Sequence, residues 1–249
     1  MAKKMILPRQ VNRRIGQAMQ DYSMLAHGDS VLVAVSGGVD SLVLAWLLHR
    51  WLRKAPISYG LRVVHIDMGF GRGKSAGKDG IDGLGPVEEI RQQLHRFNIS
   101  LLVHPAKPPE EGADRGCFQC ARQRRHQLFD LAREYGCNKI AFGHHKDDLI
   151  ETLFLNMLYG GNLSTMVPRQ DLFSGRLALI RPLAYLEKHE VRKMAMDLGL
   201  TAVANCCPLA GDTRRDYVRG LLQMIYDQDP GVKASIFAAM ANVRKGYLL

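Results

Sequence analysis

Short apolar runs alternate with longer amphipathic stretches along the chain, and this alternation predicts strands followed by helices. The predicted strands are residues 30–35 (SVLVAV), 60–67 (GLRVVHID), 99–104 (ISLLVH), 137–144 (CNKIAFGH) and 176–183 (RLALIRPL). The predicted helices are residues 7–28, 41–54, 87–98, 120–136, 146–160 and 187–199, with two more in 214–244 that separate at DPG. Strands that alternate with helices form a mostly parallel central sheet with helices on both faces, so we expect an α/β fold.

A chain of 249 residues is predicted to form a single domain over residues 1–249. This domain begins with an N-terminal helix (7–28) and ends with a helical C-terminal extension (about 208–249). Residues 69–86 are rich in glycine, which predicts a loop. Within that loop GRGKSA (71–76) matches the dinucleotide-binding form GxGxxA, but no apolar helix follows it, so a plain loop is favoured.

The amino-acid composition predicts a polyanionic partner. The net charge is +10 at pH 7, and nucleic acid is the commonest partner of so basic a protein, although a merely basic protein is the alternative. No apolar run approaches the ~18 residues of a membrane span. The basic start MAKKMILPRQ also lacks the long apolar region of a secretory signal. We therefore expect a cytoplasmic protein without a membrane partner.

The stretch SGGVDS, residues 36–41, follows the first predicted strand and opens the next helix. Gly37 and Gly38 let backbone amides approach a phosphate, the helix N-terminus adds its dipole, and the hydroxyls of Ser36 and Ser41 are further donors. The lysine of a GxxxxGK[ST] loop is missing, and Asp40 is tolerable beside phosphate only with a cation such as Mg²⁺. The alternative is a plain strand-to-helix turn in which glycine simply fits.

A second cluster of charged side chains, GHHKDDLIE, starts the helix that follows the fourth predicted strand. Carboxylates at Asp147 and Asp148 suit a helix N-terminus, so capping alone is one interpretation. Because two histidines and Glu151 accompany them, we favour Mg²⁺ and nucleotide positioning opposite the loop. His144 and His145 are also a candidate zinc pair, but the helical HExxH spacing is absent.

The five cysteines include CFQC, with Cys117 and Cys120 at a helix entry, and the adjacent pair Cys206 and Cys207. Adjacent cysteines rarely bind one metal together, which predicts a three-thiolate site of Cys117, Cys120 and one of the pair. Three thiolates suit a [4Fe–4S] cluster with one iron left open to carry an exogenous sulfur. The alternatives are a catalytic pair that passes a persulfide, and structural zinc. Cys137, at the start of a predicted strand, is interpreted as a buried structural residue of the core.

SGGVDS resembles the signature of the PP-loop, or N-type ATP pyrophosphatase, family. The resemblance implies a Rossmann-type PP-loop fold and cleavage of ATP between its α and β phosphates, with AMP activating an oxygen for displacement. The chain is similar over nearly its whole length to the tRNA 2-thiocytidine synthetases. The motifs that carry this similarity occur in the same order as in that family: SGGVDS, CFQCARQRR, GHHKDDLIETLFLNMLYGG, IRPLAY and NCC. That resemblance implies an ATP-dependent, iron–sulfur-dependent sulfurtransferase that replaces O2 of the anticodon-loop cytidine 32 with sulfur.

The resemblance also assigns roles to individual residues. The implied catalytic residues are Asp40, Asp147, Asp148, Arg124 and Arg125, the arginines being candidates for phosphate or tRNA contacts. The implied ATP-binding residues are Ser36, Gly37, Gly38, Asp40, Ser41, His65, Asp67, Gly143, His144 and Arg181. The implied cluster ligands are Cys117, Cys120 and Cys206, with Cys207 as the alternate. The implied cofactors are ATP, Mg²⁺ and the cluster, and the partners are tRNA and a sulfur donor such as a cysteine desulfurase or sulfide; a homodimer is left open.

The chain departs from the family in its glycine-rich segment 69–86 and at two positions of the candidate site. Val39 stands where the family usually has lysine, and NCCP differs from the usual PCxxC, which leaves the third ligand open between Cys206 and Cys207. Two other functions therefore stay open. One is a PP-loop iron–sulfur enzyme that adds or removes sulfur on another nucleoside or a small molecule. The other is a non-catalytic iron–sulfur RNA-binding protein, against which the intact loop argues.

Overall fold

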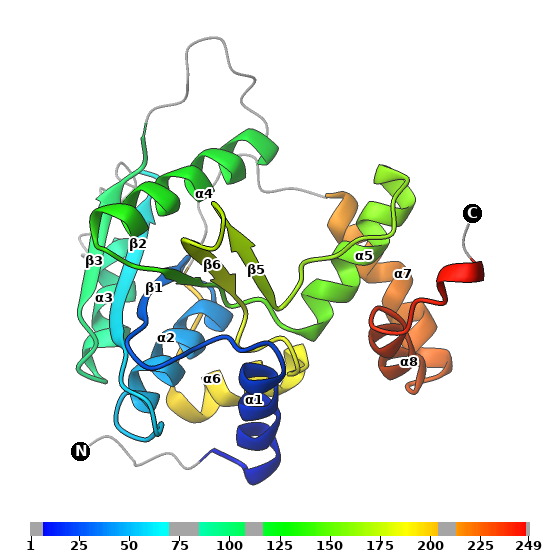
Figure 1. Cartoon of the computed structure of the whole chain (residues 1–249), viewed down its shortest axis with the longest axis horizontal. Helices are drawn as coiled ribbons and strands as arrows, with labels where there is room; N and C mark the ends of the chain where they lie inside the picture. Colours follow the sequence, from blue (N-terminus) through cyan, green and yellow to red (C-terminus); the bar gives the residue numbers. More distant parts are fainter. Residues whose placement is uncertain (1–6, 70–84, 108–116, 204–212, 248–249) are drawn as a thin grey trace, which may run out of the picture. The chain divides into compact units, whose positions relative to one another are not determined.

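The computed structural model describes residues 7–69, 85–107, 117–203 and 213–247, drawn in colour in Figure 1. The chain divides into two compact units. The sheet unit consists of Met1–His145 and Pro168–Ala210, and the helical unit consists of Lys146–Val167 and Gly211–Leu249. Every strand belongs to the sheet unit, which therefore carries the α/β architecture.

The sheet unit contains one six-stranded sheet in the order β3-β2-β1-β4-β6-β5. The strands are β1 (Ser30–Val35), β2 (Gly60–Asp67), β3 (Leu101–Pro105), β4 (Lys139–Ala141), β5 (Arg169–Leu172) and β6 (Leu177–Ile180). All neighbours pair in parallel except β5, which pairs antiparallel with β6. From β1 the strand order runs outward in both directions, with β2 and β3 on one side and β4, β6 and β5 on the other. The gap between β2 and β4, at β1, is therefore the point at which the strand order reverses. Ligands of open α/β sheets bind beyond the carboxyl ends of the strands at such a switch point.

Helices cover both faces of this sheet, as predicted (Figure 1). One face packs against α1 (Arg9–Asp21), α2 (Val39–Trp51), α3 (Pro86–His95) and α6 (Lys188–Leu198). The other face packs against α4 (Cys117–Glu134), through Leu128, Leu131 and Ala132. Strands β1, β2, β3, β4 and β6 therefore contribute side chains to two separate hydrophobic layers, one on each face of the sheet.

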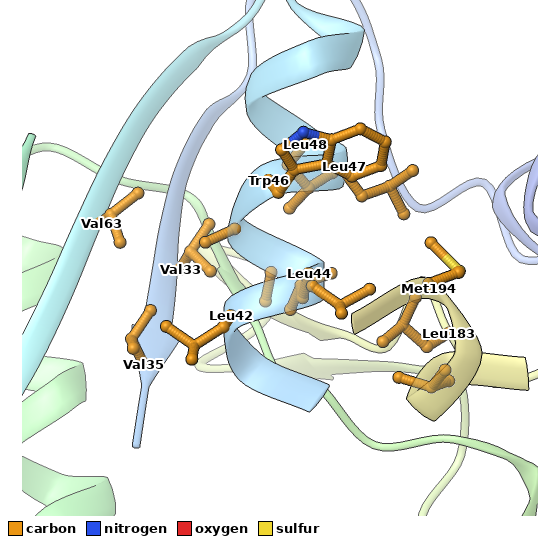
Figure 2. Packing of buried hydrophobic residues seen from close by; sticks show 14 of the residues in the cluster. Val33, Val35, Leu42, Leu44, Trp46, Leu47, Leu48, Val63, Leu183 and Met194 are labelled. Carbon is orange, nitrogen blue, oxygen red and sulfur yellow. The ribbon is translucent and has the colours of Figure 1, made fainter. Parts of the chain in front are cut away.

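Helix α2 is the most deeply buried helix of the sheet unit, because its residues Ser41–Leu48 are all buried. Figure 2 shows it between Val33, Val35 and Val63 of the strands on one side and Leu183 and Met194 on the other. A helix that is apolar all round can only sit inside a core. This packing holds the start of α2, and with it the glycine loop, in a rigid position.

The helical unit contains α5 (Lys146–Gly160), α7 (Arg214–Gln228), α8 (Val232–Ala239) and the short 3₁₀ helix η1 (Lys245–Tyr247). Its small core is formed by Ile150, Val218 and Leu222. Thr213 starts α7 with a capping box, in which its side chain accepts from the Asp216 amide and the Asp216 carboxylate accepts from the Thr213 amide. In the part of the chain described here, no helix is long and apolar enough to cross a membrane.

Most predicted elements lie within a few residues of their observed bounds, and β1, β2 and α5 have the predicted bounds. The N-terminal helix is shorter than the predicted 7–28, because the chain leaves the helix at Asp21 and Ser23 adopts a positive φ of 44°. The predicted strand 137–144 contains only three strand residues, Lys139–Ala141. Strand β5 was missed altogether, because RQDL is a polar, partly exposed edge strand without an apolar run.

Candidate functional site

The loop between β1 and α2 is folded around its own serine hydroxyls. The Ser41 hydroxyl accepts from the Ser36 amide at 3.1 Å and donates to the Gly38 carbonyl at 2.8 Å. The Gly38 amide donates to the Ser36 hydroxyl at 3.3 Å, and Gly37 has a φ of +93°, which glycine adopts without strain. These hydrogen bonds within the loop fix its shape at the N-terminal end of the buried helix α2, beyond the carboxyl end of β1.

The turn after β4 lies directly against this loop. A Cβ atom on Gly143 would lie 2.8 Å from the Asp40 carbonyl carbon and 2.9 Å from the Ser41 nitrogen, closer than a real side chain can come. Only glycine therefore allows the two strand-end segments to meet. Beside this contact, Nε2 of the buried His145 lies 3.9 Å from Oδ2 of Asp40, which is an electrostatic contact rather than a hydrogen bond.

His65 and Asp67 lie at the carboxyl end of β2, next to the loop strand. Nδ1 of His65 lies 2.8 Å from the Val35 carbonyl oxygen, so Nδ1 carries the proton that it donates. Burial lowers the pKa of His65, and the positive charge of Arg124 lowers it further, so the imidazole is neutral at pH 7. The Asp67 carboxylate accepts a hydrogen bond from the Gly69 amide at 2.8 Å, which stabilises the turn that follows the strand.

Arg181 follows β6 and is only 5% exposed. Burial, together with the neighbouring charge of Arg125, lowers the pKa of Arg181 to about 10, which still leaves it charged at pH 7. Two guanidinium groups that repel each other at one edge of the sheet favour an anion between them. The charge of Arg125 thus acts on Arg181, and the charge of Arg124 acts on His65.

The predicted cluster ligands are only partly covered by the structure. Cys120 lies in the first turns of α4 as a half-buried free thiol. Cys117 begins that helix, but its side chain is outside the described part, as are Cys206 and Cys207. Val203, the last described residue before this pair, is hydrogen-bonded to the glycine loop: its amide donates to the Gly37 carbonyl at 3.0 Å. Cys137 is buried among apolar side chains, as expected of a structural thiol.

The predicted acidic residues at the start of α5 have basic partners within the helical unit. Lys233 donates to Asp147 at 2.8 Å, and Arg215 lies 4.0 Å from Asp148. A magnesium-binding role for both aspartates stays a prediction. Within residues 7–69, 85–107, 117–203 and 213–247, no three His, Cys, Asp or Glu side chains group as a metal site would require.

Glu151 is buried in this unit and forms a two-pronged ion pair with Arg219, at 2.9 and 3.1 Å. The carboxylate raises the pKa of Arg219. This pair, together with Arg215 at 3.9 Å from the same carboxylate, joins α5 to α7. Sequence reasoning missed it, although Arg215 and Arg219 stand four residues apart on one helix face, a spacing that suits a shared acidic partner.

We expect Arg219→Ala to lower the free energy of unfolding by about 2 kcal/mol. The substitution leaves the Glu151 charge buried without its two-pronged partner, and the value is below that of a fully buried pair because Arg219 is partly exposed to water. Urea unfolding followed by circular dichroism measures the change. The double variant Arg219→Ala with Glu151→Gln should recover part of the loss, whereas an unchanged urea midpoint for Arg219→Ala would contradict this account.

A glycine loop after a central parallel strand, packed against a second strand-end turn, is an arrangement typical of nucleotide phosphate sites in the doubly wound α/β class. The chain belongs to the PP-loop domain family, whose model matches residues 7–224.

Relatives match almost the full length of the chain. A tRNA-cytidine(32) 2-sulfurtransferase of Geobacter metallireducens is 35% identical over 97% of this chain and 92% of its own length. One of Geobacter sulfurreducens is also 35% identical, over 97% and 92%. Among solved structures, the U34-tRNA thiolase NcsA from Methanococcus maripaludis, with its [4Fe-4S] cluster, aligns with a TM-score of 0.71 at 21% identity, covering 93% of this chain and 78% of that one. That likeness confirms the predicted PP-loop fold.

Proposed function

We propose that this protein is an ATP-dependent and iron–sulfur-dependent tRNA thiolase that converts the anticodon-loop cytidine 32 to 2-thiocytidine. The observation that carries the proposal is the 35% identity, over 97% of the chain, to relatives named as tRNA-cytidine(32) 2-sulfurtransferases. The intact phosphate loop supports it, and so does the net charge of +10, because tRNA is a polyanion.

The loop at Ser36–Ser41 fits the pyrophosphate end of ATP. The cytosine O2 attacks the α-phosphorus, the bond from that phosphorus to the bridging oxygen of the β-phosphate breaks, and pyrophosphate leaves into the loop. Mg²⁺ in nucleotide sites commonly uses one or two carboxylates together with phosphate oxygens, and Asp40 offers such a carboxylate, with Asp147 and Asp148 as further candidates. Arg125 and Arg181 are assigned to a phosphate group, and the mutual action of their positive charges supports this assignment.

His65 and Asp67 are assigned to adenosine, together with the Gly143 and His144 turn. The neutral imidazole of His65 already uses Nδ1 on the Val35 carbonyl, which leaves Nε2 as the nitrogen available to a ligand. The aromatic ring of His144 lies 5.6 Å from that of Phe142, so the turn also offers an aromatic surface. These assignments place the nucleotide along the carboxyl ends of β1, β2 and β4.

Cys117, Cys120 and Cys206, with Cys207 as the alternate, are assigned to a [4Fe–4S] cluster. Three thiolates are a donor set that leaves one iron open, and the bound cluster would supply the site for the incoming sulfur. After adenylation the C2–O2 bond is activated: sulfur at the oxidation level of sulfide adds at C2, the C2–O2 bond breaks and AMP leaves with the oxygen. Sulfur that arrives as a persulfide from a desulfurase first takes two electrons from a thiol reductant, which leaves as a disulfide. Arg124 and Arg125 lie in the same helix as Cys120, which suits contacts to the substrate backbone.

The proposed function implies a cellular location and a source of sulfur. A tRNA-modifying enzyme of this kind acts in the cytoplasm and receives its sulfur from a cysteine desulfurase or from sulfide. A homodimer is a further element of the proposal, which the mass of the purified protein in solution tests directly.

The test is mass spectrometry of the nucleosides of tRNA from cells that lack the gene. We expect 2-thiocytidine to disappear and to return when the wild-type gene is restored, but not when the Asp40→Asn variant is supplied. Other thiolated nucleosides serve as the internal control and should stay at their normal level. An unchanged level of 2-thiocytidine would overturn the substrate assignment.

A further inference from the structure

An open groove of about 990 Å³ lies in the sheet unit between α4 and the β5–β6 hairpin. Its volume is at the upper end of the ~300–1,000 Å³ typical of ligand sites. The α4 side begins at Ala121, one residue after Cys120, and continues to Arg133, a length of about 18 Å along the helix. The groove, called the α4 groove below, therefore starts beside a predicted cluster ligand and leads away from it.

The α4 groove is strongly basic. Four arginines line it, and the single acidic residue in its lining is Asp130. Lys107 donates to Asp130 at 2.6 Å and Arg133 lies 3.4 Å from it, so nearby cations already balance this one carboxylate. The remaining lining arginines are Arg122, Arg125 and Arg176. The net positive charge fits an anionic occupant.

Aromatic rings form the other part of the lining. Phe173, at the tip of the hairpin, is 53% exposed and contacts Phe129 edge to face, with 5.7 Å between ring centroids. The ring of His126 stacks on Phe129 on α4. Phe173 has a φ of 53°, which is unusual for a bulky residue, and Arg176 Nε–H donates to its carbonyl at 3.1 Å. The turn thus holds a large apolar ring at the rim of a basic groove, at a conformational cost.

We propose that the α4 groove binds unpaired nucleotides of the tRNA that flank the reacting cytidine. The inference rests on the proposed function and adds to it a binding surface for the RNA strand. Arginine side chains hold phosphates, and exposed aromatic rings stack on unpaired bases, which double-stranded RNA does not offer. The groove shares α4 with Cys120 and with Arg125, whose charge acts on Arg181, so a strand lying in it leads to the proposed reaction centre.

Two variants test the groove without touching the proposed catalytic residues: the double variant Arg133→Ala with Arg176→Ala, and Phe173→Ala. The matched control is Arg192→Ala with Lys193→Ala, two exposed cations on α6, which packs on the opposite face of the sheet. Binding of an unmodified tRNA transcript containing cytidine 32 is measured by fluorescence anisotropy at several salt concentrations. ATP binding and thermal unfolding of each variant verify that the sheet unit is intact.

We expect the double variant to bind the tRNA at least about tenfold more weakly, with a salt slope that falls by about one for each arginine lost. Phe173→Ala should weaken binding about five- to tenfold with an unchanged salt slope, because it removes stacking and not charge. The control double variant should bind almost as well as the wild type. This combination would establish the groove as an RNA-binding surface.

Two results would overturn the inference while the proposed function stands. In the first, the groove variants bind tRNA as the control does, and the wild type still thiolates cytidine 32. In the second, the groove variants bind tRNA normally but no longer accept sulfur from a cysteine desulfurase, which makes the groove a protein-docking surface. If the wild-type protein itself neither binds nor thiolates the tRNA, the proposed function fails, and the inference fails with it.

Discussion

Cys120→Ser should yield a protein without the visible iron–sulfur absorption of the wild type and without thiolation activity. Cys120 is a half-buried free thiol near the start of α4, and it is one of the three cysteines proposed to hold the cluster. Removal of one of three thiolate ligands leaves too few bonds to hold the cluster. Anaerobic purification, an absorption spectrum and an iron determination measure the loss.

Cys137→Ala is the matched control for this experiment. Cys137 is 6% exposed, lies in the α4-side core and has its sulfur 3.4 Å from the Ser30 hydroxyl, so it behaves as a small buried apolar residue. We expect this variant to retain the brown colour and the iron content. A coloured Cys120→Ser protein, or a wild-type protein that contains zinc and is colourless, would contradict the cluster assignment.

Gly143→Ala should abolish most ATP binding and destabilise the sheet unit by about 1–3 kcal/mol. The added methyl group would lie 2.8–2.9 Å from backbone atoms of Asp40 and Ser41, at the start of the helix that presents the phosphate loop. Backbone atoms held in a packed core cannot move aside as a flexible side chain can, so the loop itself must shift. Calorimetric titration with ATP and thermal unfolding measure the two effects.

Gly16→Ala serves as the control for a glycine-to-alanine change within the same unit. A Cβ atom on Gly16, inside α1, meets nothing within 4 Å. Because alanine is the better helix former by about 1 kcal/mol, this variant should be as stable as the wild type or slightly more so. If Gly143→Ala binds ATP as tightly as Gly16→Ala does, then the close approach of the two strand-end segments does not shape the site.

Local patterns were sufficient for much of the fold. The bounds of β1 coincide with an apolar run, because a buried parallel strand must be apolar on both faces, and β2 was found from the buried Val63, Val64 and Ile66 at its centre. Helix α5 begins and ends at the predicted residues, since its acidic first turn and the glycine pair Gly160 and Gly161 at its end are local signals. Elements without such signals were missed or drawn too long: β5 is polar, and α1 ends where Ser23 turns, without glycine or proline to mark the end.

Some features of the candidate site also followed from the sequence alone, and others needed the tertiary structure. The sequence by itself determined the phosphate loop, because glycines, serines and a carboxylate in one short segment carry their chemistry wherever the segment lies. It also placed His65, Asp67 and Gly143 at strand ends, since the carboxyl ends of parallel strands share one edge of a sheet. Those assignments depended on order along the chain and not on side-chain packing.

Only the tertiary structure decided which distant side chains meet. Lys233 reaches Asp147 across 86 positions of sequence, and Arg219 reaches Glu151 across 68. The tight fit of Gly143 against Asp40 and the basic groove between α4 and the β5–β6 hairpin likewise join separate segments. No local pattern encodes such contacts, because they arise when helices and strands that are remote in sequence bury their apolar faces against one another.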